Sequence, residues 1–357
     1  MSPPLLVTSA GLPGANNLIR SLGAGDASLV VIGCHDDRFV LKKSPADRKY
    51  LVPRAGGSGW VRALRRIIRT ERIGLVIPTT DPDVAAVSGS RRRLRDRVFL
   101  PRHRVIALCQ DKHQLGAFLR SRGVPAPATY RVTDSKSVVR IFRRLPPRAR
   151  AWCRIRRGAG ALGAIRVRSA EQAWRWITFW RELRGIRATA FALSEYLPGR
   201  DFGCQSLWKD GTLVLLKSYE RLSYLGTGGQ PSEVSSIAAL GKTSFERRVA
   251  DVCARAVRAL DAKASGIFSI DLREDARGVP CITEINAGRF SSATNIFDLT
   301  GRYNMAVTYV RLAMREPVII RDEYDVADEH FMLRDVDGPV GIYDADDLFD
   351  EIVDARR

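Results

Sequence analysis

The first third of the chain alternates apolar runs of strand length with stretches of helical periodicity. Two runs, PLLVTSA at 4–10 and SLVVIGC at 28–34, flank a glycine turn and a helical stretch, and a third, GLVIPTTD at 74–81, ends in polar residues. Strands that alternate with helices are typical of a parallel sheet covered by helices. We therefore expect an α/β domain in this part of the chain. The turn GLPG lacks the GxGxxG fingerprint, so a tight connection and a ligand-binding edge both stay open.

Beyond residue 105 the expected elements become shorter, and glycine or proline separates many of them. In chain order we expect a helix at 111–122, strands at 151–156 and 164–169, a helix at 170–183, a strand and a hairpin within 191–236, and helices at 243–261 and 303–314. The acidic end of the chain is expected to add a small strand-and-helix element.

Two alternating strands, GIFSIDLRED at 266–275 and CITEINAGRF at 281–290, each carry a polar face. If their hairpin folds about Arg277 and Gly278, antiparallel pairing places Asp271 opposite Glu284, with Asn286 one step further along the same side. Facing carboxylates repel each other, and a hard divalent cation removes that penalty. The three oxygen ligands suit Mg²⁺, with Mn²⁺ as an alternative ion. The other interpretation is an exposed hairpin whose polar face meets only water.

A glycine loop follows the strand at 151–156. Its glycines, Gly158, Gly160 and Gly163, give a flexible hairpin tip whose backbone N–H groups can lie over phosphate oxygens, and a preceding arginine supplies positive charge. The loop is not a P-loop, since no GK[ST] follows it. Together with a Mg²⁺ site, it indicates a nucleoside triphosphate.

The composition limits the classes of protein to which the chain can belong. The 357 residues are 45% hydrophobic, without a long uncharged apolar run or a signal-peptide pattern, so we expect a cytoplasmic globular protein that does not enter a membrane. The six cysteines form no CxxC or Cys/His cluster, which argues against a zinc site and a disulfide framework.

The net charge of +19 is unevenly distributed. Residues 322–357 hold 13 acidic and 3 basic residues, which leaves 55 basic and 26 acidic residues before them. The arginine runs at 62–69 and 90–97 carry isoleucine or leucine at helical spacing, as solvated helix faces do. We therefore favour a solvated surface over a nucleic-acid patch, which is kept as an alternative.

The order of these motifs resembles that of the ATP-grasp ligases, and most closely the synthetase halves of carbamoyl-phosphate synthase large subunits and their stand-alone relatives. The resemblance covers roughly residues 1–318 and rests on DK with GVPAPAT, CRIRRGAGALG, SEYLPGRD, SIDLRED and CITEINAGRF. It implies a Rossmann-like pre-ATP-grasp domain before a two-lobed ATP-grasp domain built on antiparallel sheets. The implied boundaries are 1–108 for the first domain, 109–190 for the small lobe, 191–318 for the C-terminal lobe with the metal site, and 319–357 for an acidic extension.

The resemblance also implies roles for single residues. Lys112 and Arg154 would hold the phosphates of ATP beside the glycine loop. The hinge residues Glu195, Tyr196 and Leu197 would border the adenine. Asp201 would accept hydrogen bonds from the ribose, and the metal ligands would be those of the hairpin.

Three cations are candidates for the catalytic residues. Arg289 would neutralise the substrate carboxylate or the acylphosphate, although EINAGR places it one residue further along than the EINPR of many members. Lys217 and Arg221 precede a glycine-rich loop within 215–234 that is long enough to close over a reaction centre. An exposed hairpin with incidental basic residues is the alternative for that segment.

The implied reaction activates a carboxylate as an acylphosphate and couples it to an amine, with ADP and phosphate as products. Small-molecule acids and amines are then the partners, and pairing of two copies into a homodimer is left open. Two alternatives remain: an enzyme that activates bicarbonate or carbamate, and a basic module that binds nucleic acid.

Overall fold

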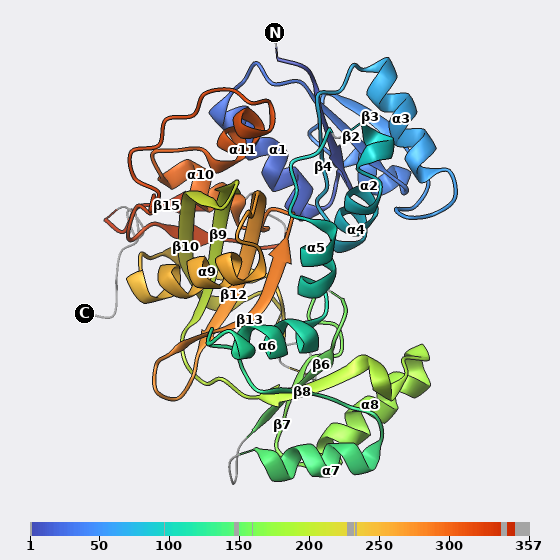
Figure 1. Ribbon diagram of the computed structural model, residues 1–357, viewed down its shortest axis with the longest axis vertical. Coiled ribbons are helices and arrows are strands. Elements are labelled where there is room, and N and C mark those ends of the chain that lie inside the picture. The colour runs from blue at the N-terminus through green and yellow to red at the C-terminus, as the bar shows by residue number, and fades with distance from the viewer. Residues whose placement is uncertain are drawn as a thin grey trace, which may run out of the picture.

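The computed structural model describes residues 2–95, 97–145, 150–158, 160–226, 232, 234–336 and 341–346. In these ranges the strands form three sheets (Figure 1): a parallel sheet at the top, a large antiparallel sheet at its lower left, and a small antiparallel sheet at the bottom. We name them sheet A, sheet C and sheet B, respectively. The predicted combination of a parallel α/β domain with two antiparallel sheets is confirmed.

Sheet A is four-stranded and parallel, in the order β3-β2-β1-β4, with strands Leu5–Thr8 (β1), Val31–His35 (β2), Arg48–Leu51 (β3) and Leu75–Ile77 (β4). The helices between and after its strands are Pro13–Gly25 (α1), Arg38–Lys42 (α2), Trp60–Thr70 (α3) and Asp81–Gly89 (α4). The apolar runs predicted three of the strands. They missed β3, because an edge strand made of RKYL is mostly exposed and has no apolar face.

Sheet B has the order β5-β8-β6-β7, with strands Thr129–Arg131 (β5), Ala151–Ile155 (β6), Ile165–Val167 (β7) and Phe191–Glu195 (β8). Its apolar face packs against Ser135–Arg144 (α7) and Ala170–Arg184 (α8). Burial alternates along β6, so Trp152 and Arg154 point to the face without helices. That face looks toward sheet C.

Sheet C has the order β13-β12-β9-β10-β11-β14-β15, and its strands are Asp201–Lys209 (β9), Thr212–Tyr224 (β10), Ala238–Thr243 (β11), Gly266–Glu274 (β12), Pro280–Ala287 (β13), Phe331–Leu333 (β14) and Gly341–Tyr343 (β15). The helix Arg247–Leu260 (α9) covers one face with apolar contacts. It begins later than predicted, because the residues up to Thr243 belong to β11.

The acidic extension contributes β14 and β15 to sheet C, so its expected strand is confirmed. Residues 337–340 and 347–357 of this extension lie outside the described ranges, and so does part of the glycine-rich segment at 215–234.

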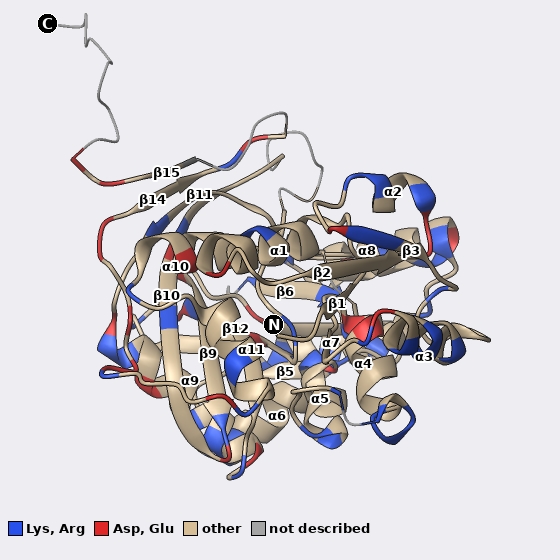
Figure 2. Ribbon diagram, turned by 90° about the horizontal axis from the view of Figure 1, so that it is seen from above, with Lys and Arg blue, Asp and Glu red and all other residues tan. Residues whose placement is uncertain are grey.

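The remaining helical elements connect the sheets. They are the helices His103–Cys109 (α5), Lys112–Ser121 (α6), Thr294–Thr300 (α10) and Met305–Ala313 (α11), and the 3₁₀ turns Arg92–Leu94 (η1) and Ala188–Ala190 (η2). None of the helices in the described ranges combines the length and apolar character that crossing a membrane requires. In Figure 2 basic residues are spread over several elements, among them α2 and α3, as on a solvated surface.

Candidate active site

The hairpin of β12 and β13 brings the predicted metal ligands together. Asp271 pairs with Glu284 and Ser269 pairs with Asn286, as the sequence predicted. The turn is centred on Arg277 instead of between Arg277 and Gly278, because the N–H of Asp275 donates to the carbonyl of Val279 (2.9 Å). A bulge at Thr283 on β13, opposite the step from Asp271 to Leu272 on β12, restores the predicted register.

The bulged residue Thr283 ties the hairpin to sheet B. Its carbonyl accepts a hydrogen bond from Nη2 of Arg154 (2.8 Å), and its Oγ1 donates to the carbonyl of Asp271 (3.1 Å). Burial lowers the pKa of the Arg154 guanidinium, and the nearby Glu284 and Asp271 oppose this effect. Arg154 therefore places a positive charge between the two sheets.

Arg221 on β10 links two carboxylates on neighbouring strands. Its Nη1 lies 2.9 Å from Oδ1 of Asp201, and its Nη2 contacts Oδ1 of Asp271. Burial lowers the pKa of Arg221, but the pull of Asp271, Tyr219 and Asp201 outweighs burial and raises it well above its usual value. The guanidinium crosses over Gly203, where a Cβ atom would lie only 2.8 Å from Nη2 of Arg221. Glycine at this position is what allows the two carboxylates to share one cation.

Lys112 connects the glycine loop to the hairpin of β12 and β13, which carries the predicted metal ligands. Its Nζ donates to the carbonyl of Gly158 (2.7 Å) and lies 3.2 Å from Oε1 of Glu284. The residue begins α6, whose N-terminal N–H groups are capped by the buried carboxylate of Asp111, and Arg156 pairs with that carboxylate at 2.9 Å. Lys112 is thus held between the predicted phosphate loop and the predicted metal ligand.

The loop itself adopts backbone angles that favour glycine. Gly158, Gly160 and Gly163 have φ values of 146°, 73° and 66°, all in the region that other residues rarely adopt. These angles explain why glycine occupies the three positions of the predicted loop. Their contact with phosphates stays a prediction.

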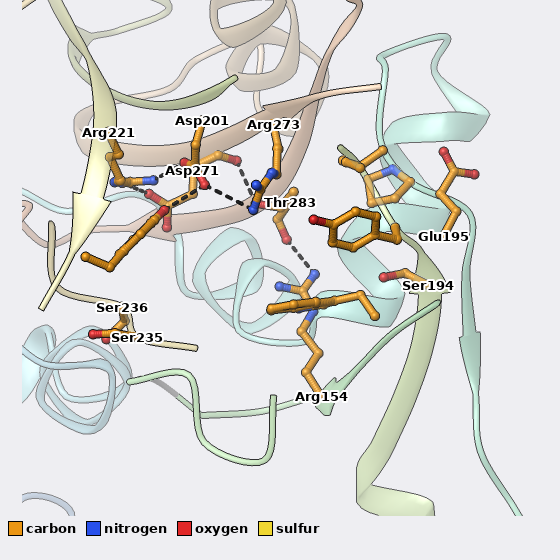
Figure 3. A pocket seen from close by; sticks show the side chains of 15 residues that line it. Arg154, Ser194, Glu195, Asp201, Arg221, Ser235, Ser236, Asp271, Arg273 and Thr283 are labelled. Carbon is orange, nitrogen blue, oxygen red and sulfur yellow. Dashed lines mark hydrogen bonds and ion pairs between the residues drawn. The ribbon is translucent and has the colours of Figure 1, made fainter. Parts of the chain in front are cut away.

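A cavity of about 170 Å³ lies between sheets B and C, and Figure 3 shows the side chains around it. The predicted hinge lines it with Glu195, Tyr196 and Leu197, although Figure 3 shows the Glu195 carboxylate pointing away from Arg221 and Asp271. Oε2 of Glu195 accepts a hydrogen bond from the N–H of Ala128 (3.3 Å). The Glu195 side chain therefore forms part of the wall of the cavity rather than its floor.

Asp201 also lines this cavity, but its carboxylate already has partners. Tyr224 donates its hydroxyl to Oδ2 (2.6 Å), while Arg221 holds Oδ1. Burial raises the pKa of the Tyr224 hydroxyl, and Asp201 adds to this effect, so the phenol stays protonated. A ribose would bind here by sharing or replacing these hydrogen bonds.

Several residues of the cavity escaped the sequence analysis. Arg273 follows Asp271 on the same face of β12, and Trp152 precedes Arg154 on the same face of β6, so strand alternation contained a signal for both. Ser235 and Ser236 also line the cavity. No pattern in the sequence distinguishes these two serines from other loop serines.

Arg289 joins the hairpin to the first domain. Its Nε lies 2.6 Å from Oδ1 of Asp81, at the start of α4, and its Nη2 donates to Oδ1 of Asn286 (2.5 Å). The extra residue, Gly288, has φ of 92° and lets the chain turn so that the guanidinium still reaches the metal strand. Arg289 therefore lies beside a predicted ligand despite the changed spacing.

Lys217 is not part of the cavity, so its expected catalytic role needs correction. Its side chain is 1% exposed, and its ammonium pairs with Asp325 at 2.9 Å and donates to the carbonyls of Phe297 and Tyr303. An ammonium has three N–H donors, and these partners use all of them. Lys217 shares a strand face with Arg221, but α10 and the acidic extension cover it.

The neighbourhood of Lys217 gives a pH-dependent prediction. Burial raises the pKa of Asp298 to about 6. A carboxyl whose pKa is higher in the folded than in the unfolded chain stabilises the fold at low pH, and this contribution is lost as pH rises through the folded pKa. We expect Asp298→Asn to gain stability over the wild type by up to about 2 kcal/mol between about pH 4 and about pH 7. Urea unfolding at both pH values tests this, and a constant difference would contradict it.

The donor set fits Mg²⁺ bound together with phosphates. Among the described residues, no group of three or more His, Cys, Asp or Glu side chains is arranged to hold a metal ion. The hairpin supplies two carboxylates and one amide, and Mg²⁺ usually completes its shell with water and substrate phosphates. In the structure each ligand contacts its own cation: Asp271 with Arg221, Glu284 with Lys112, and Asn286 with Arg289.

The structure is similar to solved enzymes along most of its length. An L-amino acid ligase from Bacillus licheniformis is 12% identical, with a TM-score of 0.70 over 93% of this chain and 79% of that chain. The biotin carboxylase domain dimer of the Hydrogenobacter thermophilus 2-oxoglutarate carboxylase, in complex with MgADP, ADP and bicarbonate, is 14% identical, with a TM-score of 0.69 over 92% and 73%. A carboxyaminoimidazole ribonucleotide synthase from Aspergillus clavatus, complexed with ATP, is 13% identical, with a TM-score of 0.68 over 93% and 81%.

The chain has the ATP-grasp fold. No protein-family model matches the sequence, and no curated protein sequence matches it. At these identities the ATP-grasp likeness concerns the fold, whereas the closer likeness to carbamoyl-phosphate synthase stays a prediction. The predicted site residues that line the cavity between sheets B and C are Arg154, Glu195, Tyr196, Leu197, Asp201, Arg221 and Asp271. Glu284 contacts Lys112, and Asn286 contacts Arg289.

Proposed function

We propose that the chain is an ATP- and Mg²⁺-dependent ligase that activates a carboxylate as an acylphosphate and couples it to an amine. The observation that carries this proposal is the position of Lys112, which contacts both the glycine loop at Gly158 and the metal strand at Glu284. A cation at this junction lies where a triphosphate would run from the hinge toward the hairpin. The similarity to an amino acid ligase and to enzymes in complex with ATP or MgADP supports the proposal.

The reaction balances without a further reactant. A carboxylate oxygen attacks the γ-phosphorus of ATP, the bond to the ADP oxygen breaks, and an acylphosphate forms. The amine nitrogen then attacks the acyl carbon, the bond to phosphate breaks, and the nitrogen releases its proton. The products are ADP, phosphate and an amide.

The residues of the cleft would act mainly by placing charge. Lys112 and Arg154 would neutralise the phosphate oxygens as charge moves from the γ-phosphoryl group to ADP. Arg289 would hold the carboxylate or its acylphosphate at the end of the metal strand. Mg²⁺, when bound by Asp271, Glu284 and Asn286, would offset the charge of the phosphates.

Arg221 would prepare the cleft for the nucleotide. It holds Asp201, the proposed ribose ligand, and Asp271, the proposed metal ligand, on adjacent strands. A guanidinium that fixes both carboxylates reduces the reorganisation needed when the nucleotide binds. We infer that Arg221 positions these ligands, whether or not it also touches the phosphates.

An acylphosphate trap tests the proposal directly. The full-length protein is incubated with MgATP, hydroxylamine and one carboxylic acid at a time from a panel that includes the amino acids. We expect at least one acid to give ADP and a hydroxamate in equal amounts, because hydroxylamine replaces the natural amine as nucleophile. ADP release without any hydroxamate, stimulated by bicarbonate alone, would support the bicarbonate alternative. Absence of ADP release with every acid would overturn the proposal.

A further inference from the structure

A second cavity, of about 370 Å³, lies in the first domain at the carboxyl ends of the strands of sheet A. It is lined by the ends of β1 and β2, the start of α4, and the segment that leads into α3. The volume is in the range of sites for small molecules. This cavity shares no lining residue with the cleft between sheets B and C.

One wall of the cavity holds a buried hydroxyl without a hydrogen-bond partner and a buried carboxylate that pairs with no cation among the described residues. Oγ1 of Thr8 is buried, in a side chain that is 1% exposed, and has no hydrogen-bond partner. Asp83 is 3% exposed, and no ion pair joins it to a cation among the described residues. Leaving a buried hydroxyl unpaired and a buried carboxylate uncompensated is costly for a folded protein. A ligand with several N–H donors and a positive charge would remove both costs.

Ser9 completes this wall from a strained position. Its φ of 50° lies in the left-handed region, which residues with a side chain seldom adopt, and its Oγ donates to Oδ2 of Asp83 (2.6 Å). Strained residues of this kind concentrate at ligand-binding sites. Because the Ser9 hydroxyl donates to Asp83, its lone pairs stay available to accept from a ligand. Ser9 and Asp83 thus present acceptors to the cavity, and the hydroxyl of Thr8 can accept as well as donate.

The cavity also has a cationic group in its lining. Arg54 lines it, and the segment after Arg54 leads to α3, whose N-cap residue Gly59 supplies no side-chain cap. The lining carboxylate of Asp36 lies 3.0 Å from Nδ1 of His35. The N–H groups in the first turn of such a helix, together with a guanidinium, favour an anionic group. The buried side chain of Trp60 adds an apolar surface to the lining.

We propose that this cavity binds a small amino compound that also carries an anionic group, as an amino acid does. Its ammonium would lie against Thr8, Ser9 and Asp83, and its anionic group would face Arg54 and the start of α3. The identification of this compound as the amine acceptor rests on the proposed ligase function, whereas the binding site does not. Its location supports that role, since Asp81, which pairs with Arg289 of the cleft, is two residues before Asp83.

Calorimetric titration without nucleotide tests the site. The probes are the twenty standard amino acids, β-alanine and γ-aminobutyrate, with propionate and propylamine as compounds that carry only one of the two groups. We expect saturable binding of at least one amino acid and weaker binding of both single-group compounds. In Asp83→Asn the affinity for that amino acid should fall by at least about tenfold, because a hydrogen bond to a charged group is lost. Thr8→Val should weaken it to a smaller degree.

The matched control is Asp26→Asn. Asp26 lies at the C-terminal end of α1, whereas Thr8 and Ser9 precede its N-terminal end, so this variant should bind the amino acid like the wild type. Binding of an ATP analogue with Mg²⁺ should be the same in all four proteins. Absence of binding by every amino acid, or equal affinity in Asp83→Asn and the wild type, would overturn the inference. Amino acid binding that depends on Asp83 in a protein without hydroxamate formation would instead retain the site and reject the ligase proposal.

Discussion

Replacing Glu284 with alanine is expected to lower kcat/KM for ADP formation by at least about two orders of magnitude. Its carboxylate is 19% exposed and combines two roles in the proposed site, as a ligand for Mg²⁺ and as the partner of Lys112. Removing it takes away a metal ligand and also leaves the ammonium free to turn away from the phosphates. Steady-state release of ADP, with the acid and amine that the wild type uses, measures this loss.

Two comparisons separate chemistry from folding in this variant. The expected change in the midpoint of thermal unfolding is small, because Lys112, although buried, keeps its hydrogen bond to the carbonyl of Gly158, and Glu284 is partly exposed. Asp210→Asn, which alters an exposed carboxylate in the turn between β9 and β10, serves as the control and should keep wild-type kinetics. Full turnover of the Glu284→Ala protein would remove the hairpin from the mechanism.

Replacing Lys217 with methionine is expected to lower the free energy of unfolding by about 3–5 kcal/mol. The substitution leaves Asp325, whose side chain is 4% exposed, without its cation and leaves the carbonyls of Phe297 and Tyr303 without their donor. Hydrogen bonds from Lys217 and the backbone lower the pKa of Asp325 even though burial raises it. Urea unfolding at neutral pH measures the loss.

A double variant tests whether this loss comes from the ion pair. Asp325→Asn removes the negative charge and keeps one acceptor oxygen for the N–H groups of Arg302 and Tyr303, which donate to the two different carboxylate oxygens of Asp325. We expect Lys217→Met combined with Asp325→Asn to be less destabilised than the two single losses added together. A Lys217→Met protein with wild-type stability and no ADP formation would instead return Lys217 to the catalytic residues.

The sequence predicted those features that depend on local pattern. The apolar runs of β1, β2 and β4 identified the parallel sheet. Strands that are buried on both faces consist of nearly continuous apolar residues, and such runs stand out in a sequence. The alternation in β12 and β13 identified the pair of Asp271 and Glu284. Its register was predicted correctly because the bulge at Thr283 offset a small error in the predicted position of the turn.

Features that depend on distant parts of the chain were not predictable in this way. Lys217 and Arg221 lie on one face of β10. Lys217 is buried by contacts with residues much later in the chain, among them Asp325, more than 100 positions away. The reach of Arg221 to Asp271 requires a glycine on the strand between them, which strand alternation alone does not reveal. Strand β3 was also not predictable, because its place in the sheet depends on backbone pairing with β2.

The most direct test of the account is a crystal structure of the protein with a non-hydrolysable ATP analogue and Mg²⁺. The account predicts adenine in the cavity beside Tyr196 and Leu197, phosphates between Lys112 and Arg154, and Mg²⁺ at about 2.0–2.1 Å from oxygens of Glu284 and Asn286. Density for the nucleotide elsewhere, or Mg²⁺ bound without either hairpin ligand, would contradict it.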